Sequence, residues 1–172
     1  MSLAIDVREL LSQPGSSRRV RVQEGVPDLG TELVQVPPDA PVEADLLLES
    51  VVEGVLASGR LSGVMTGTCA RCLAGFERSF DVSVQELFAP GAAREDDEYP
   101  LEEQTVDLEP MIRDAVVLAM PFSPLCRADC LGLCERCGGD RNRDECRCPP
   151  QETDVRWSVL SGLDLPDIHS EP

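Results

Sequence analysis

Alternating polar and apolar positions dominate the chain from about residue 32 to residue 88. TELVQV, which begins at Thr31, alternates as a half-buried strand does, and Leu46–Leu48 and Val51–Val52 continue the apolar signal. RLSGVMTGTC and FERSFDVSVQELF predict two further strands with the loop Cys69–Cys72 between them. Glycines at positions 54, 59 and 63 are typical of turns or bulges. The pattern predicts an antiparallel β meander, which could curl toward a barrel.

Two stretches have helical spacing. Val7 to Leu11 predicts a short helix that ends before the turn Pro14–Gly15. The main helix is expected at about residues 105–120, with Asp107 as N-cap and a proline allowed in its first turn. We expect this helix to pack against the sheet rather than to present a partner-binding surface. Its predicted apolar face consists of Met111, Ile112, Ala115, Val116 and Ala119.

The remaining segments complete an α+β organisation in three parts. Residues 1–120 are expected to form a β-rich core domain with the main helix, 121–150 a cysteine-rich zinc-binding segment, and 151–172 a short helix and a frayed tail. Ser16–Val22, which holds three arginines, is expected to be a solvated edge strand. Ala89–Gln104, with the acidic run 95–98, is expected to be a solvated loop. Asp154 is a candidate N-cap for the last helix, with Trp157 and Leu160 on one side.

The charge of the chain narrows the class of partner. Against 32 acidic residues stand 15 basic ones, all of them arginine, and the net charge is -17. Such a polyanion resists docking on a phosphate backbone and favours approach to basic proteins. No apolar run is long enough to span a membrane, and the first ten residues do not resemble a secretory signal. We therefore expect a cytoplasmic protein whose thiols stay reduced.

Six of the eight cysteines cluster in the last third of the chain, between residues 126 and 148. In a reducing compartment they predict structural zinc rather than disulfides. Cys134 and Cys137, followed by Gly138, have the spacing of a zinc knuckle. The second pair of ligands could be Cys126 and Cys130 or Cys146 and Cys148; the spacing does not decide between them.

Cys69 and Cys72 form a separate C-x2-C pair on the predicted loop between two strands. They could supply metal ligands to the C-terminal cluster, and eight sulfurs suffice for two four-cysteine sites. A purely structural or redox role is equally open, and Arg71 could lower a thiol pKa there. We expect the pair Cys134 and Cys137 to matter more for metal binding than this upstream pair.

No catalytic constellation is recognisable, so the chain is not predicted to be an enzyme. The single histidine, His169, lies three residues from the C-terminus, and a Ser-His-Asp or Cys-His arrangement would have to use it. No glycine-rich phosphate-binding loop is present, and no small-molecule substrate is expected. An all-cysteine ligand set favours a closed structural zinc site over a catalytic one.

Taken together, several of these stretches resemble the YceD family of large ribosomal RNA subunit accumulation proteins. The similarity runs from about Leu46 to Leu163 and rests on TCARCL, FERSFDVSVQELF, VDLEPMIRDAVVLAMPFSPLC, CRADCLGLCERCG and DVRWSVLSGL. The family commonly has an asparagine-rich step after the C-G and Asp-Pro-Arg at the last helix. This chain has Gly139–Asn142 and Asp154–Arg156 there, and neither difference touches a thiol.

The resemblance implies a non-enzymatic role in producing or stabilising large-subunit ribosomal RNA. With the charge of -17, it leads us to expect a partner in the pre-ribosomal large-subunit particle or a basic ribosomal protein, with limited direct RNA contact. Two alternatives stay open: a redox-controlled chaperone that loses zinc on oxidation, and a zinc-stabilised protein-binding adaptor.

Overall fold

The computed structural model describes residues 3–91, 99–143, 146–149, 154, 156, 157 and 160. Within these described residues, ten helices and strands follow one another. They are β1 (Ala4–Asp6), α1 (Arg8–Leu11), β2 (Ser17–Glu24), β3 (Val34–Gln35), β4 (Val42–Ser50), β5 (Val55–Thr68), β6 (Gly75–Ala89), β7 (Tyr99–Glu102), β8 (Thr105–Asp107) and α2 (Leu108–Ala119).

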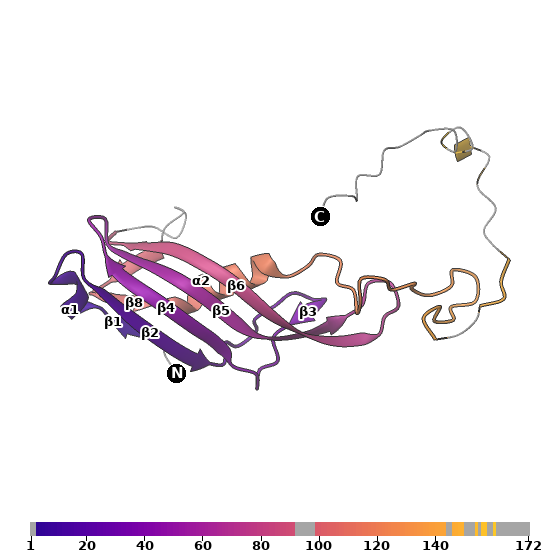
Figure 1. Cartoon of the computed structure of the whole chain (residues 1–172), viewed down its shortest axis with the longest axis horizontal. Helices are drawn as coiled ribbons and strands as arrows, with labels where there is room; N and C mark the ends of the chain where they lie inside the picture. Colours follow the sequence, from indigo (N-terminus) through magenta and orange to yellow (C-terminus); the bar gives the residue numbers. More distant parts are fainter. Residues whose placement is uncertain are drawn as a thin grey trace.

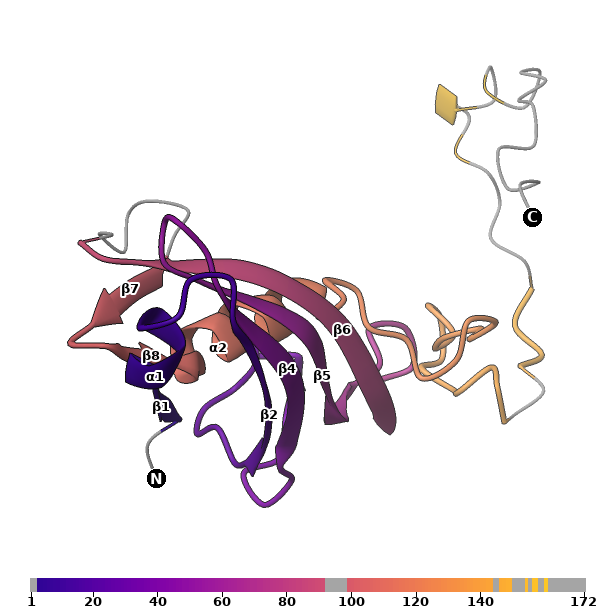
Figure 2. The same ribbon diagram turned by 60° about the vertical axis from the view of Figure 1, so that its left-hand side comes forward.

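The strands form one curled sheet, a half-barrel, with α2 on its inner side (Figures 1 and 2). Its strand order is β1-β8-β7-β6-β5-β4-β2, and β3 pairs with β5 away from this path. Strands β4, β5 and β6 are successive antiparallel neighbours, and β2 is an edge strand, as predicted. The expected α+β fold with a curled sheet and one main helix is therefore confirmed.

Two glycines of β5 lie where a neighbouring strand leaves no room for a side chain: Gly59 against the backbone of β4 and Gly63 against a ring of β6. Gly59 has φ +155°, and a Cβ there would lie 2.2 Å from the carbonyl oxygen of Asp45 on β4. Gly63 lies opposite Phe80, whose ring atoms come within 2.8 Å of the space that a Cβ would fill. A side chain at Gly59 would push β4 away, so glycine is required where these strands approach closely.

One hydrophobic core fills the inner side of the sheet. Along β4 every second residue is buried, from Val42 to Leu48, which is the period expected of a strand with one solvated face. The helix expected at about residues 105–120 is α2, but residues 105–107 form strand β8 instead, because they pair with β1 and β7. The predicted N-cap is confirmed: the Asp107 carboxylate accepts a hydrogen bond from the backbone N–H of Glu109 at 3.1 Å. From α2 the core receives Leu108, Met111, Ile112 and Val116. Ala119 is exposed, contrary to prediction, and Met120 is buried in its stead because the helix ends there.

The sequence interpretation was wrong in the region that joins the meander to α2. Part of the expected loop Ala89–Gln104 is strand β7, which pairs in parallel with the end of β6. β7 turns into β8 through Glu103 and Gln104, whose φ values are 44° and 71°. Such a tight turn usually contains glycine or asparagine, so the ordinary sequence signal for a hairpin is missing. The acidic run 95–98 lies outside the described residues.

Three smaller predictions also need comment. Of TELVQV only Val34–Gln35 is strand, and Val52 is fully exposed in the turn between β4 and β5. The helix expected after Asp154 lies mostly outside the described residues, although the Asp154 carboxylate accepts a hydrogen bond from the N–H of Arg156 at 2.9 Å. Neither helix in the described part of the chain is long and apolar enough to cross a membrane.

Candidate metal centres

The eight cysteines lie in two groups of four, beyond the far end of the β5–β6 hairpin (Figure 1). Tetrad 1 consists of Cys69, Cys72, Cys126 and Cys130, and tetrad 2 of Cys134, Cys137, Cys146 and Cys148. Within each tetrad all sulfur atoms lie within 4.8 Å of one another, and all eight thiols are free of disulfides. The structure thus brings Cys146 and Cys148, rather than Cys126 and Cys130, close to Cys134 and Cys137.

The hairpin loop fixes the first half of tetrad 1. The N–H of Cys69 donates to the carbonyl of Ala74 and the N–H of Leu73 donates to the carbonyl of Cys69, both at 2.9 Å. Leu73 adopts the left-handed conformation with φ 58°, which closes the loop. These bonds place Cys69 and Cys72 on the same side of a rigid turn.

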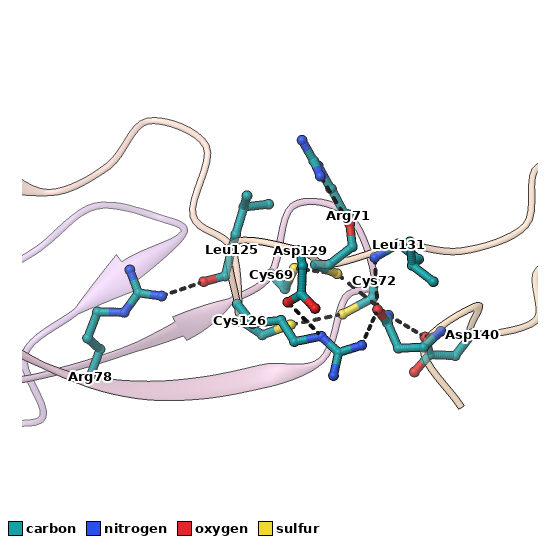
Figure 3. A network of polar contacts seen from close by, with 12 residues as sticks. Cys69, Arg71, Cys72, Arg78, Leu125, Cys126, Asp129, Leu131 and Asp140 are labelled. Carbon is teal, nitrogen blue, oxygen red and sulfur yellow. Dashed lines mark hydrogen bonds and ion pairs between the residues drawn. The ribbon is translucent and has the colours of Figure 1, made fainter. Parts of the chain in front are cut away.

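The segment after α2 brings the second half of tetrad 1 (Figure 3). The N–H of Ala70 donates to the carbonyl of Pro124 at 2.7 Å, and the guanidinium of Arg78 donates to the carbonyl of Leu125 at 2.9 Å. Cys126 then faces Cys72, and Cys130 faces Cys69. Cys69, Cys72 and Cys130 are 0%, 8% and 2% exposed, so tetrad 1 is a small buried core of its own.

Tetrad 2 combines a knuckle, formed by Cys134 and Cys137, with two cysteines from the irregular segment that follows it, Cys146 and Cys148. The N–H of Gly138 donates to the carbonyl of Cys134, and the N–H of Cys134 donates to the carbonyl of Gly139, both at 2.8 Å. Gly138 has φ 70°, the left-handed conformation expected after the second cysteine of the knuckle. Cys137 is exposed and the other three cysteines are half-buried. Tetrad 2 is therefore more exposed to solvent than tetrad 1, in which only Cys126 is half-buried and the other three cysteines are buried.

The sulfur separations fit zinc. Tetrahedral zinc with bonds of about 2.3 Å requires sulfurs about 3.8 Å apart. In tetrad 1 the separations are 3.8 Å for Cys69 and Cys130 and 3.6 Å for Cys72 and Cys126. In tetrad 2, Cys146 lies 3.3 Å from the sulfur of Cys134 and 3.7 Å from that of Cys137. Both tetrads are close enough to hold a metal ion with four thiolate ligands.

Electrostatics also favours a cation at each tetrad. Burial raises the pKa of Cys69, but hydrogen bonds from the backbone N–H groups of Cys126, Cys72 and Arg71 outweigh it and lower the pKa to about 6. Burial and the neighbouring thiols raise the pKa of Cys126 to about 12. In tetrad 2, backbone hydrogen bonds at the knuckle lower the pKa of Cys134 to about 6, while hydrogen bonds with Cys146 and Cys137 raise that of Cys148 to about 12. One thiol of each group ionises easily and another resists, because thiolates this close repel one another; a divalent cation removes the conflict.

Arg71 acts differently from the sequence interpretation. Its backbone N–H contributes to lowering the pKa of Cys69, but its guanidinium donates to the carbonyl of Cys130 at 3.0 Å. Arg71 thus ties the two halves of tetrad 1 together. Two further contacts were not predicted: that of Arg78 with the carbonyl of Leu125, and that of the Asn142 side-chain nitrogen with the sulfur of Cys130 at 3.6 Å. The partners in each contact are distant in sequence, and no spacing indicates them.

Comparison with known proteins places these cysteines in a family. The family model described as large ribosomal RNA subunit accumulation protein YceD matches residues 57–164, which include both tetrads. The chain belongs to the YceD family. The similarity that TCARCL and the cysteine-rich segment indicated is thereby confirmed.

Relatives extend the match over almost the whole chain. An uncharacterized protein of Mycobacterium tuberculosis is 39% identical over 92% of this chain and 79% of its own length. One from Mycobacterium leprae is 35% identical over 96% of this chain and 79% of its own length. The Arabidopsis thaliana protein called large ribosomal RNA subunit accumulation protein YCED homolog 1, chloroplastic, is 32% identical over 38% of this chain and 20% of its own length. No solved structure matches.

Proposed function

We propose that this chain is a non-enzymatic ribosome biogenesis factor that supports the accumulation of large-subunit ribosomal RNA in the cytoplasm. The observation that carries the proposal is the family match over residues 57–164. Two structural zinc ions, one in each tetrad, belong to the proposal. Their role is to order the cysteine-rich segment, which has few large apolar side chains to bury: Leu131 is 56% exposed.

The test of the function is depletion of the protein followed by measurement of the two ribosomal RNAs. We expect large-subunit RNA to fall relative to small-subunit RNA, and the wild-type gene to restore the ratio. An unchanged ratio would remove the family-based function, and the zinc-stabilised adaptor would then be the better proposal.

The partner we propose is a basic ribosomal protein or the assembling large-subunit particle rather than naked RNA. The net charge is -17, and the densest arginine cluster is partly engaged within the chain. Arg19 and Arg21 contact the carboxylate of Asp45 at 3.3 and 3.2 Å, and Arg18 donates to the carbonyl of Asp6 at 2.8 Å. These contacts support limited binding to phosphates, which needs clustered and available cations.

The partner is tested by binding assays against isolated large-subunit RNA and against purified basic ribosomal proteins at one ionic strength. Exposed charges are screened in both cases, so salt dependence alone does not distinguish them. We expect binding to a basic protein. Sub-micromolar binding to protein-free RNA, with none to the proteins, would contradict this choice of partner.

The exposure of Cys137 supports a second candidate, a redox-controlled chaperone that releases zinc when tetrad 2 is oxidised. Such a switch needs a large apolar surface to uncover. Around the tetrads the candidates are few, and Leu73 and Leu131 are exposed already. An oxidised, zinc-free protein that suppresses aggregation of an unfolded client, when the reduced protein does not, would favour this candidate.

A further inference from the structure

Asn142, the only asparagine of the chain, forms side-chain hydrogen bonds both with the segment that carries Cys126 and Cys130 and with Asp140 in its own loop. It lies between Cys137 and Cys146 in sequence and so belongs to the loop that closes tetrad 2. Its side-chain oxygen accepts hydrogen bonds from the N–H of Leu131 at 2.8 Å and from the guanidinium of Arg127 at 2.9 Å. Its side-chain nitrogen donates to the sulfur of Cys130, a tetrad 1 ligand, at 3.6 Å.

The partners fix which end of the amide is oxygen. The N–H of Leu131 and the guanidinium of Arg127 can only donate, so they require an acceptor. The other end faces the thiol of Cys130 and the carboxylate of Asp140, which accepts at 2.6 Å. An ionised carboxylate requires a donor there, so the N–H group must point toward the sulfur.

The backbone joins the two tetrads at the same place. Three residues separate Cys130 from Cys134. The N–H of Leu133 donates to the carbonyl of Arg71 in the hairpin loop, and the N–H of Arg141 donates to the carbonyl of Gly132, both at 3.0 Å. A β-bridge pairs Leu133 with Asp140, whose carboxylate also accepts from the N–H of Asn142 at 2.9 Å (Figure 3 shows Leu131 and Asp140 beside tetrad 1). Ordering one tetrad therefore orders the loop that carries the other.

We propose that Asn142 is a positioning residue that couples metal binding at the two tetrads. The inference rests on the proposed zinc binding. A hydrogen bond from an N–H group to a metal-bound thiolate orients the sulfur and offsets part of its charge, and outer partners of this kind typically change metal affinity by about 10–100-fold. A metal in tetrad 2 holds Asn142 against Cys130, and a metal in tetrad 1 holds Cys130 against Asn142. The coupling is reciprocal, as linkage requires.

The test is a double-mutant cycle read by metal affinity. Tetrad 2 is disabled by Cys137→Ser with Cys146→Ser, and the affinity of tetrad 1 for Co²⁺ is measured by thiolate absorption in competition with a chelator. This is done with and without Asn142→Ala. We expect disabling tetrad 2 to weaken tetrad 1 by about tenfold in the presence of Asn142, within the 5–150-fold usual for coupled sites. In the Asn142→Ala background the same change should have a clearly smaller effect, because only the backbone contacts between the two tetrads then remain.

Two further variants make the test specific. Asn142→Asp keeps the acceptor oxygen for Leu131 and Arg127 but loses the N–H donor, so it should reduce the coupling as Asn142→Ala does. Arg143→Ala removes an exposed ion pair with Asp140 in the same loop, with no contact to tetrad 1 among the described interactions, and should leave the coupling intact.

The results separate the inference from the proposal beneath it. Two metals that bind independently in the wild-type protein would overturn the coupling alone. Full coupling in Asn142→Asp would overturn the role of its N–H group. A wild-type protein that binds no zinc or cobalt would overturn the zinc sites and the coupling together, without bearing on ribosomal RNA accumulation.

Discussion

Tetrad 1 and tetrad 2 each consist of four cysteines, but different parts of the chain hold them. Tetrad 1 takes two cysteines from the loop of a long β-hairpin and two from the segment after α2, and three of its four cysteines are buried. Tetrad 2 takes all four cysteines from residues 134–148, and none is buried. A site that joins distant segments depends on the fold and, with a metal bound, also stabilises the contact between those segments. A site within one short segment can order only that segment.

This comparison changes which cysteine pair we expect to matter most. The spacing of Cys134 and Cys137 is the stronger sequence signal for zinc. Cys69 and Cys72, however, are candidate ligands that the hairpin loop already holds in place, because backbone hydrogen bonds close this loop. Preorganised ligands lose less conformational entropy on binding, so tetrad 1 should bind metal more tightly.

The largest expected effect comes from breaking tetrad 1. Cys69→Ser should weaken its metal affinity by about 4 kcal/mol, one quarter of the upper range for a four-ligand structural zinc, or roughly 1000-fold. The segment that follows α2 should then become sensitive to trypsin at Arg127 and Arg136. Metal content and limited proteolysis measure this. The matched variant Cys137→Ser should lose one metal but keep the segment attached; the opposite ranking would reverse the comparison.

The next effect tests whether the sheet is independent of the metals. Gly59→Ala should destabilise the sheet by about 3 kcal/mol, because a Cβ meets the Asp45 carbonyl and the φ of +155° is strained. For a chain of this size that is a fall in Tm of about 10 °C. Gly15→Ala is the control, since its φ is +80° but nothing lies within 4 Å; it should cost only about 1 kcal/mol. Metal content should stay unchanged in both, and metal loss with Gly59→Ala would show that sheet and tetrads are not separable.

A smaller effect should appear in the rate of metal release. With excess chelator, two phases are expected, and tetrad 2 should release its metal about tenfold faster, a difference of about 1.4 kcal/mol in barrier. The reason is that a chelator can reach Cys137 directly but must wait for the hairpin loop to open at tetrad 1. Cys137→Ser should remove the fast phase and leave a single phase, that of tetrad 1. A single phase in the wild-type protein would mean that exposure does not control release.

Much of the fold could be predicted from local patterns, and the failures have a physical cause. The long strands β4, β5 and β6 alternate over many residues, and Asp107 marks the start of α2 with a capping side chain. β7 was missed because it is short, pairs in parallel and ends in a turn of Glu103 and Gln104, which lacks glycine. Local sequence patterns indicate the periodicity of buried positions and the capping residues of helices. They do not indicate which distant strand a short segment will pair with.

Of the candidate site, too, only the part that depends on local sequence could be predicted. The choice of the eight cysteines as candidate metal ligands follows from their spacing and the expected reducing compartment, and the left-handed conformation of Gly138 follows from the knuckle pattern. The partition into two tetrads could not be predicted from spacing, because only the fold of the hairpin and the path of the chain after α2 bring Cys69 and Cys126 together. The hydrogen bonds that Arg71, Arg78 and Asn142 form around tetrad 1 could not be predicted from the sequence for the same reason.

The smallest expected effect concerns the two arginines that tie the segment after α2 to the hairpin. Arg71 donates to the carbonyl of Cys130 in a partly buried contact, and Arg78 donates to the carbonyl of Leu125 in an exposed one. Water can replace an exposed donor easily but reaches a partly buried carbonyl less well, so a lost bond costs more at Cys130. We expect Arg71→Ala to weaken the attachment by about 1 kcal/mol and Arg78→Ala by about 0.5 kcal/mol.

Hydrogen exchange of the Leu133 amide measures this, since that N–H donates to the carbonyl of Arg71 and is released only when the segment leaves the hairpin. Protection should fall about fivefold in Arg71→Ala and about twofold in Arg78→Ala, with both metals retained. Arg71→Lys keeps the charge but not the planar donor group, and it should resemble Arg71→Ala if the hydrogen bond is what matters. Equal losses in Arg71→Ala and Arg78→Ala would mean that the metal in tetrad 1, rather than these side chains, holds the segment in place.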